Sequence, residues 1–184
     1  MNSPVFILGY MGSGKTTFGR ALASTTGRQF IDLDEYIVNR FRKSVTDIFR
    51  EKGESGFRDL EASMLREVGE FEDVVIACGG GTPCCHDNME YMLSRGLTVF
   101  LDTSEKCICR RLISNSSRRP LISGKSADEI KRFVHSNLAE RMPHYRRAVI
   151  RFAGDELESR REIRESVEAF MKSNMSQIRK ISGG

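Results

Sequence analysis

The stretch that decides the fold is Val5-Phe6-Ile7-Leu8-Gly9-Tyr10-Met11-Gly12-Ser13-Gly14-Lys15-Thr16. Its apolar residues 5–8 predict a strand that is buried on both faces. The residues that follow fit Gly-x-x-x-x-Gly-Lys-Thr, the pattern of a loop that binds nucleotide phosphates between a strand and a helix. Glycines let backbone N–H groups curl around phosphate oxygens, and the helix N-terminus adds partial positive charge. A glycine-rich turn with an incidental lysine is the alternative, and the strand–helix context argues against it.

Two side chains of this loop carry its chemistry. The Lys15 amine would neutralise the β- and γ-phosphates of a nucleotide, and the Thr16 hydroxyl would ligate Mg²⁺. The loop therefore predicts a site for a nucleoside triphosphate with its metal.

Outward from this loop, strand-like apolar runs alternate with helical stripes. The predicted strands are residues 5–8, 30–33, 74–77, 97–101 and 148–152. Helices are predicted from the phosphate loop to Gly27, at 36–41, at 46–52 with Gly53 as a stop, through 57–68, at 89–93, from Ser104, from the capping box at 126–129, and at 163–171. Short connections between alternating strands and helices imply a parallel sheet with helices on both faces, so the fold class is α/β.

The composition favours one globular domain, or at most one domain with small insertions. The chain has 184 residues, 39% apolar and 29% charged, which is enough to bury a core without disulfides or metal. No apolar run approaches the ~20 residues of a membrane span, and the N-terminus lacks a basic segment, so we expect no signal peptide and a cytoplasmic protein. The net charge of +4 is spread along the chain, and a few arginines aimed at a small anionic substrate explain it as well as a nucleic-acid patch would. Because no Lys/Arg block of the nucleic-acid type appears, we expect no nucleic acid as a partner.

Asp32 and Asp34 are candidate catalytic carboxylates at the end of the second predicted strand. Residues two apart on a strand point the same way, so both would face the cleft beyond the carboxyl ends of the strands. One would hold Mg²⁺ through water, and the other would orient or deprotonate an attacking hydroxyl. The alternative is that Asp34 caps the following helix.

Further candidates lie along the rest of the chain. Gly79-Gly80-Gly81 follows the third strand, and its lack of side chains would let the backbone approach a ligand. Arg58 suits bidentate recognition of a carboxylate, although a solvated helix face is the more ordinary interpretation. Arg119-Pro120 ends a Ser/Asn-rich segment that is either a mobile flap or an ordinary surface loop. The pattern alone does not choose among Arg141 and its basic neighbours.

Taken together, these residues resemble shikimate kinase, from about Val5 to Phe152. The matching motifs are, in the family's order, the phosphate loop, Asp32-Leu33-Asp34, Gly53-Glu54 with Phe57-Arg58 and Glu61, Gly79-Gly80-Gly81, Arg119-Pro120-Leu121, and Arg141-Met142-Pro143-His144-Tyr145. The phosphate loop alone marks a vast superfamily. The phenylalanine–arginine pair before the triple glycine, followed by arginine–proline–leucine, is much more specific.

The resemblance implies an activity and an architecture. The activity is Mg²⁺-dependent transfer of the γ-phosphate of ATP to the 3-hydroxyl of shikimate, giving shikimate 3-phosphate and ADP in aromatic amino-acid biosynthesis. The architecture is a single P-loop kinase domain over residues 1–184, a three-layer sandwich with a five-stranded parallel sheet. Substrate-binding helices would span about 33–62, and a mobile lid about 113–125. The partners would be small molecules only, and the protein a monomer.

The resemblance also assigns residues. It makes Lys15, Asp34 and Arg119 catalytic, and places the metal at Thr16 and, through water, at Asp32. It assigns nucleotide binding to Gly12, Ser13, Gly14, Lys15, Thr16, Thr17, Arg111 and Arg119. It assigns shikimate binding to Asp34, Phe57, Arg58, Gly79, Gly80, Gly81 and Arg141.

Three other interpretations remain at this stage. Another P-loop kinase, for gluconate or a nucleoside monophosphate, is the nearest. A nucleotide acceptor would need a pocket for its base, whereas Arg58 and Arg141 suit a compact carboxylate. A GTP-binding switch would carry an Asn-Lys-x-Asp motif, which the sequence lacks. An inactive binding module is disfavoured because Lys15, Asp34 and Arg58 occur together.

Overall fold

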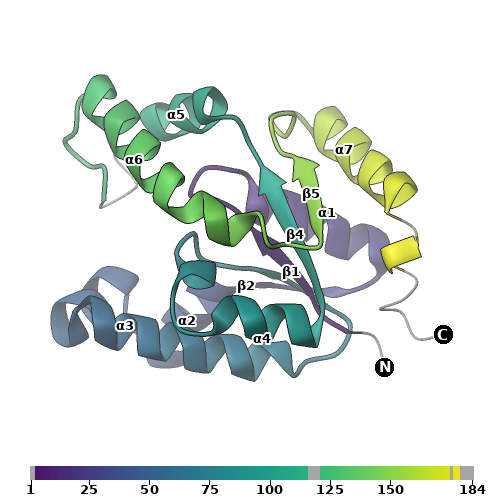
Figure 1. Ribbon diagram of the computed structural model, residues 1–184, viewed down its shortest axis with the longest axis horizontal. Coiled ribbons are helices and arrows are strands. Elements are labelled where there is room, and N and C mark those ends of the chain that lie inside the picture. The colour runs from purple at the N-terminus through teal and green to yellow at the C-terminus, as the bar shows by residue number, and fades with distance from the viewer. Residues whose placement is uncertain (1–2, 116–120, 175, 179–184) are drawn as a thin grey trace.

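The computed structural model describes residues 3–115, 121–174 and 176–178, which form a parallel sheet between helices (Figure 1). The five strands in this part of the chain are β1 (Val5–Leu8), β2 (Gln29–Asp32), β3 (Val74–Ala77), β4 (Leu97–Asp102) and β5 (Ile150–Ala153). The helices are α1 (Lys15–Thr26), α2 (Leu33–Phe41), α3 (Val45–Gly69), the 3₁₀ turn η1 (Thr82–Cys84), α4 (Asn88–Arg95), α5 (Glu105–Ser114), α6 (Ala127–Tyr145) and α7 (Arg160–Ser173). The predicted α/β class is confirmed, and β1 and β3 match their predicted ranges.

Alternation along the buried strands divides the core into two layers. On β1, Val5 and Ile7 pack with Phe18 of α1 and Phe170 of α7 on one face. Phe6 and Leu8 face the opposite side, toward the core that is shared with α2, α3, α4, α5 and α6. Figure 1 shows α1 and α7 together on one side of the sheet, in agreement with this division. None of the described helices is long and apolar enough to cross a membrane.

The strand order β2-β3-β1-β4-β5 places the site. β3 pairs in parallel with both β1 and β2, and its last residue, Ala77, is in register with Ile7 on one side and Asp32 on the other. The segments that leave these three strands therefore begin side by side at one edge of the sheet. In open α/β sheets this edge, beyond the carboxyl ends, is where ligands bind.

Helix α3 is interrupted at Gly53, as predicted for two helices with Gly53 as a stop. Gly53 adopts φ 70° and ψ −178°, which is not helical, so α3 consists of two helical segments joined by a sharp kink. The helix begins at Ser44, whose Oγ accepts from the Asp47 N–H at 3.1 Å. The kink sets the direction of the second half of α3, which carries Phe57, Arg58 and Glu61.

We predict that Gly53→Ala destabilises the fold by about 1–3 kcal/mol, because this backbone conformation is almost confined to glycine. Nothing lies within 4 Å of the added methyl group, so the cost is conformational rather than steric. Urea unfolding measures it. Ser63→Ala, at an exposed position later in α3, is the control and should leave the free energy of unfolding unchanged or slightly higher. Equal stability of Gly53→Ala and the wild type would contradict a fixed kink.

Candidate active site

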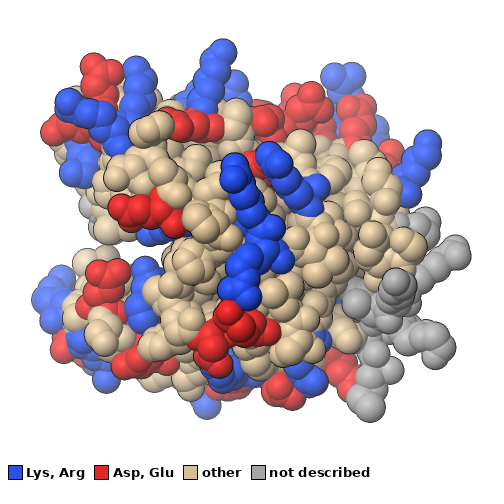
Figure 2. Space-filling model, in the orientation of Figure 1, with Lys and Arg blue, Asp and Glu red and all other residues tan. Residues whose placement is uncertain are grey.

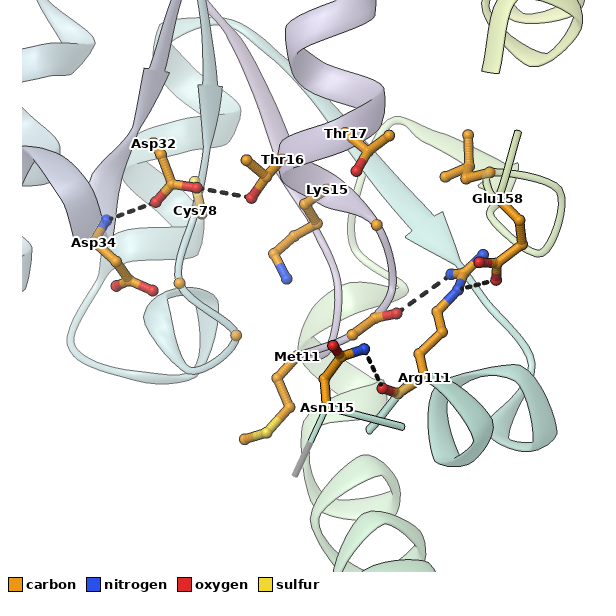
Figure 3. Close-up of a pocket in the computed structure, with 15 residues that line it drawn as sticks. Met11, Lys15, Thr16, Thr17, Asp32, Asp34, Cys78, Arg111, Asn115 and Glu158 are labelled. Atoms are coloured by element: carbon orange, nitrogen blue, oxygen red, sulfur yellow. Dashed lines mark hydrogen bonds and ion pairs between the residues drawn. The ribbon is translucent and has the colours of Figure 1, made fainter. Parts of the chain in front are cut away.

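Two adjoining cavities lie at the carboxyl ends of β1, β2 and β3. The first, of about 360 Å³, is lined by the phosphate loop, Asp32, Asp34 and Arg111 (Figure 3). The second, of about 310 Å³, lies between Phe57 and Arg58 of α3 and Arg141 of α6. In the orientation of Figure 1, Figure 2 shows the left edge of the molecule hollowed between the part built by α3 and the part built by α5 and α6.

The two cavities share a wall. Met11, Asp34, Gly79 and Gly80 line both of them. A group bound in one cavity therefore meets a group bound in the other beside Asp34.

The phosphate loop presents its two functional side chains to the first cavity. Figure 3 shows the Lys15 amine between Asp34 on one side and Arg111 on the other, and its Nζ donates to the Tyr10 carbonyl at 2.8 Å. The Thr16 hydroxyl donates to Asp32 Oδ2 at 2.8 Å. Thr17 also lines this cavity, as predicted for a nucleotide-binding residue.

The back of the loop is held through its carbonyl groups. Arg111 Nη1 donates to the Gly12 carbonyl at 3.3 Å and to the Ser13 carbonyl at 3.1 Å, and the Thr103 hydroxyl donates to the same Ser13 carbonyl at 2.9 Å. The Ser13 N–H donates to the Tyr10 carbonyl at 3.1 Å, so the loop is also held by a hydrogen bond within its own backbone. The sequence analysis missed Thr103, because nothing in its local pattern marks a contact 90 residues away.

Arg111 lies on the cavity wall farthest from Asp34 in Figure 3. Its Nε donates to Glu158 Oε1 at 2.8 Å, and its Nη2 donates to the Asp155 carbonyl at 2.9 Å. The side chain is 14% exposed. Arg111 thus joins the phosphate loop to the segment after β5, and Glu158 is a further lining residue that the sequence analysis did not identify.

Asp32 and Asp34 occupy different elements, contrary to the prediction of one strand. β2 ends at Asp32, which caps α2 by accepting from the N–H groups of Asp34 at 3.2 Å and Glu35 at 3.4 Å. The alternative that Asp34 is the cap is therefore wrong. Asp34 is the second residue of α2 and projects toward the cavity (Figure 3).

The environment of Asp34 raises its pKa to about 6. Desolvation by the surrounding protein is the main cause, followed by the nearby carboxylates of Asp32 and Glu61; Lys15 and Arg58 act in the opposite direction. The side chain is nonetheless open to the cleft, so water screens part of this effect. A carboxylate whose pKa lies close to neutrality is a better proton acceptor than an ordinary aspartate.

On the far side of Asp34, Arg58 is fixed by a buried carboxylate. Its Nη1 donates to Glu61 Oε2 at 2.8 Å, and Glu61 is 1% exposed. The guanidinium lies over the Phe57 ring at 5.4 Å, and Phe57 stacks on Phe49 at 4.4 Å. The predicted substrate residues Phe57 and Arg58 therefore lie together, with the guanidinium group stacked over the aromatic ring.

Arg141 approaches the second cavity from α6. Its guanidinium lies over the Tyr10 ring at 5.3 Å. Tyr145, one turn later, donates from its hydroxyl to the Gly80 carbonyl at 2.5 Å and so ties α6 to the glycine loop. The sequence pattern did not choose Arg141 over its basic neighbours, but the structure places it with Arg58 on the same cavity.

The three glycines make room for these charged side chains. A Cβ on Gly81 would lie 2.7 Å from Arg58 Nη2, and one on Gly79 would lie 2.7 Å from Glu61 Oε1. A Cβ on Gly80 would lie 3.3 Å from Arg141 Nη1. All three positions are thus constrained by packing as well as by access for a ligand.

The predicted lid is described only in part. Arg119 lies outside the described residues, together with the rest of 116–120, so its role stays a prediction from the sequence. Leu121, on the far side of this segment, lines the second cavity and is 64% exposed.

A magnesium ion would suit the donors beside the phosphate loop. Thr16 and Asp32 offer a hydroxyl and a carboxylate, the hard oxygen donors that Mg²⁺ prefers. The described residues hold no group of three or more His, Cys, Asp or Glu side chains arranged to bind a metal alone. This set fits Mg²⁺ that is bound mainly by waters and nucleotide phosphates, as is usual for that ion.

Comparison with known proteins gives a single family. The family model described as shikimate kinase matches residues 11–172. The shikimate kinase of Phocaeicola vulgatus is 50% identical over 168 residues, which cover 91% of this chain and 96% of the relative. The 1.7 Å crystal structure of shikimate kinase from Bacteroides thetaiotaomicron has a TM-score of 0.92 and 46% identity, covering 95% and 99% of the two chains. Shikimate kinase from Acinetobacter baumannii in complex with shikimate has a TM-score of 0.81 and 29% identity, covering 96% and 94%.

We predict that Asp34→Asn stabilises the fold at neutral pH. The pKa of Asp34 is raised from 3.8 to about 6, so between these values the folded protein holds a proton that the unfolded chain releases. Stability is therefore lost as the pH rises through this window, and an uncharged amide avoids the loss. Denaturant midpoints should be higher for Asp34→Asn at about pH 7.5, and the difference should shrink toward about pH 4.

Asp128→Asn makes the same chemical change on the exposed surface of α6 and should not stabilise the protein. Equal midpoints for Asp34→Asn and the wild type across this pH range would show that the environment of Asp34 is not unfavourable to its charge.

Proposed function

This chain belongs to the shikimate kinase family, and we propose that it transfers the γ-phosphate of ATP to the 3-hydroxyl of shikimate where its two cavities meet. As a member of this family it is an ATP-dependent kinase. The observation that carries the proposal is the position of Asp34, on the wall of both the phosphate-loop cavity and the arginine-lined cavity. A carboxylate at this junction can face the acceptor hydroxyl and the phosphate that the hydroxyl attacks.

In the proposed reaction, Asp34 accepts a hydrogen bond from the attacking hydroxyl and takes its proton. The hydroxyl oxygen forms a bond to the γ-phosphorus while the bond from that phosphorus to the bridging oxygen of ADP breaks. The pKa of about 6 leaves Asp34 ionised at neutral pH and basic enough to receive the proton.

On the nucleotide side, the chain supplies charge and oriented dipoles. Lys15 would neutralise the β- and γ-phosphates, and the N–H groups of the loop would receive their oxygens. Arg111, at the other end of the cavity, would lie near the adenine base, with its guanidinium edge bound to carbonyls and to Glu158. Thr16 directly and Asp32 through water would hold Mg²⁺, which when bound neutralises phosphate charge.

On the acceptor side, Arg58 and Arg141 would grip the carboxylate of shikimate. Two guanidinium groups that converge on one cavity favour a compact anion, since each can donate paired hydrogen bonds to a carboxylate. Phe57 would pack against the ring, and the Gly80 backbone would complete the pocket. A single chain supplies these residues, so the proposal needs no second copy of the protein.

We predict that kcat/KM for shikimate falls below about pH 6 by about tenfold per pH unit, because protonated Asp34 cannot accept the proton of the hydroxyl. A pH–rate profile measured with saturating ATP tests this limb. Asp32→Asn and Glu61→Gln each remove a charge that raises the pKa of Asp34, so in either variant with measurable turnover the limb should move to lower pH. If the fall in kcat/KM occurred at the wild-type pH in both variants, it would have to result from the titration of another group.

The proposed activity is tested by ADP release in a coupled assay with Mg²⁺-ATP and shikimate, gluconate or a nucleoside monophosphate. Strong stimulation by shikimate alone is expected. A response to gluconate instead would keep the phosphate loop and a carboxylate pocket but would exclude shikimate as the acceptor. A response to a nucleoside monophosphate instead would exclude the proposed carboxylate pocket.

A further inference from the structure

Thr82 connects the glycine loop to the substrate-binding part of α3. It is the first residue of η1 and is fully buried. Its hydroxyl donates to Glu61 Oε1 at 2.6 Å, and the other oxygen of that carboxylate accepts from Arg58 Nη1 at 2.8 Å. Thr82 does not line either cavity, so any effect it has on a substrate must pass through these neighbours.

Glu61 needs both of these donors because it is a buried charge. A carboxylate removed from water is stable only when its oxygens are hydrogen-bonded or paired with a cation. Thr82 satisfies one oxygen and so leaves the second to face Arg58. With only one partner, the carboxylate would be free to rotate, and the direction of the Arg58 guanidinium would no longer be fixed.

The backbone of Thr82 is itself held through both its N–H and its carbonyl group. Its N–H donates to the Gly79 carbonyl at 3.1 Å, and its carbonyl accepts from Asn88 Nδ2 at 3.0 Å. Asn88 is fully buried and accepts from Arg66 Nη1, on α3, at 3.2 Å. The hydroxyl that holds Glu61 therefore projects from a rigid support that spans η1, α4 and α3.

We propose that Thr82 is a positioning residue for recognition of the shikimate carboxylate: its hydroxyl orients Glu61, and Glu61 in turn aims Arg58 into the second cavity. This inference rests on the proposed function, in which Arg58 grips that carboxylate. Orienting partners behind a binding residue fix its geometry and so govern affinity for the ligand.

The test is Thr82→Val, which keeps the shape of the side chain and removes the donor. KM for shikimate should rise about tenfold, the effect of losing a hydrogen bond to a charged group. KM for ATP and kcat should change little, because the interaction lost is not with the nucleotide and not confined to the transition state. Calorimetric titration with shikimate should show the same loss of affinity. Thr82→Ser restores the hydroxyl and should recover most of it.

Thr98→Val is the matched control. Thr98 lies on β4, lines neither cavity and is as buried as Thr82. Its hydroxyl accepts a hydrogen bond from the Val149 N–H at 3.0 Å. Thr98→Val should lower the unfolding temperature without changing KM for shikimate. An unchanged KM for shikimate in folded Thr82→Val would overturn the proposal, as would an equal rise in both KM values or a failure of Thr82→Ser to recover affinity.

A double-mutant cycle with Glu61→Gln tests the route. If Thr82 acts through Glu61, the two effects on shikimate affinity should be strongly non-additive, whereas simple addition would contradict the proposed chain of contacts. Arg58→Lys separates this inference from the function on which it rests. Unchanged shikimate affinity in Arg58→Lys would remove the proposed carboxylate pocket. A loss of affinity in Arg58→Lys without any loss in Thr82→Val would contradict only the proposed role of Thr82 and would leave the carboxylate pocket in place.

Discussion

The site depends on the parallel pairing of β3 between β1 and β2. This pairing brings three segments that are far apart in the sequence to one edge of the sheet: the phosphate loop after β1, Asp32 and Asp34 after β2, and the glycine loop after β3. The phosphate loop supplies backbone dipoles, the segment after β2 supplies carboxylates, and the glycine loop leaves space because it has no side chains. If β3 lay elsewhere in the sheet, the same motifs would be present in the chain but would not form a common wall between two cavities.

The three carboxylates near this edge differ because their surroundings differ. Asp32 accepts hydrogen bonds from the Thr16 hydroxyl and from the N–H groups of Asp34 and Glu35 at the start of α2. Glu61 is buried against Arg58 and Thr82, which suits a structural anion. Asp34 is crowded by both of them, and its pKa rises to about 6. Similar acids therefore differ in how well their charge is accommodated, and the least favourable charge lies on the carboxylate that we propose as the proton acceptor.

Local patterns predicted most of this arrangement, and long-range contacts account for what they missed. The phosphate loop, the strands and the glycine run depend on a few adjacent residues, so the sequence indicates them directly. The pairing of Arg58 with Glu61 is also visible, since residues three apart lie on one face of a helix. Thr103, Glu158 and the role of Thr82 depend on partners 21 to 90 residues away, and threonine or glutamate has no pattern that reveals such a partner. The error about the two aspartates came from extending β2 by one residue.

The glycine run leaves space for neighbouring side chains as well as for a ligand. Three consecutive glycines predicted a backbone that a ligand could approach. In the structure, much of the space that Cβ atoms would fill is already taken by Arg58, Glu61 and Arg141. The ligand would meet guanidinium groups that are held close to the sheet edge because the backbone beneath them has no side chains. The glycines therefore matter for packing as well as for access: a methyl group at Gly81 would displace the Arg58 guanidinium, and with it the surface that we propose recognises a carboxylate.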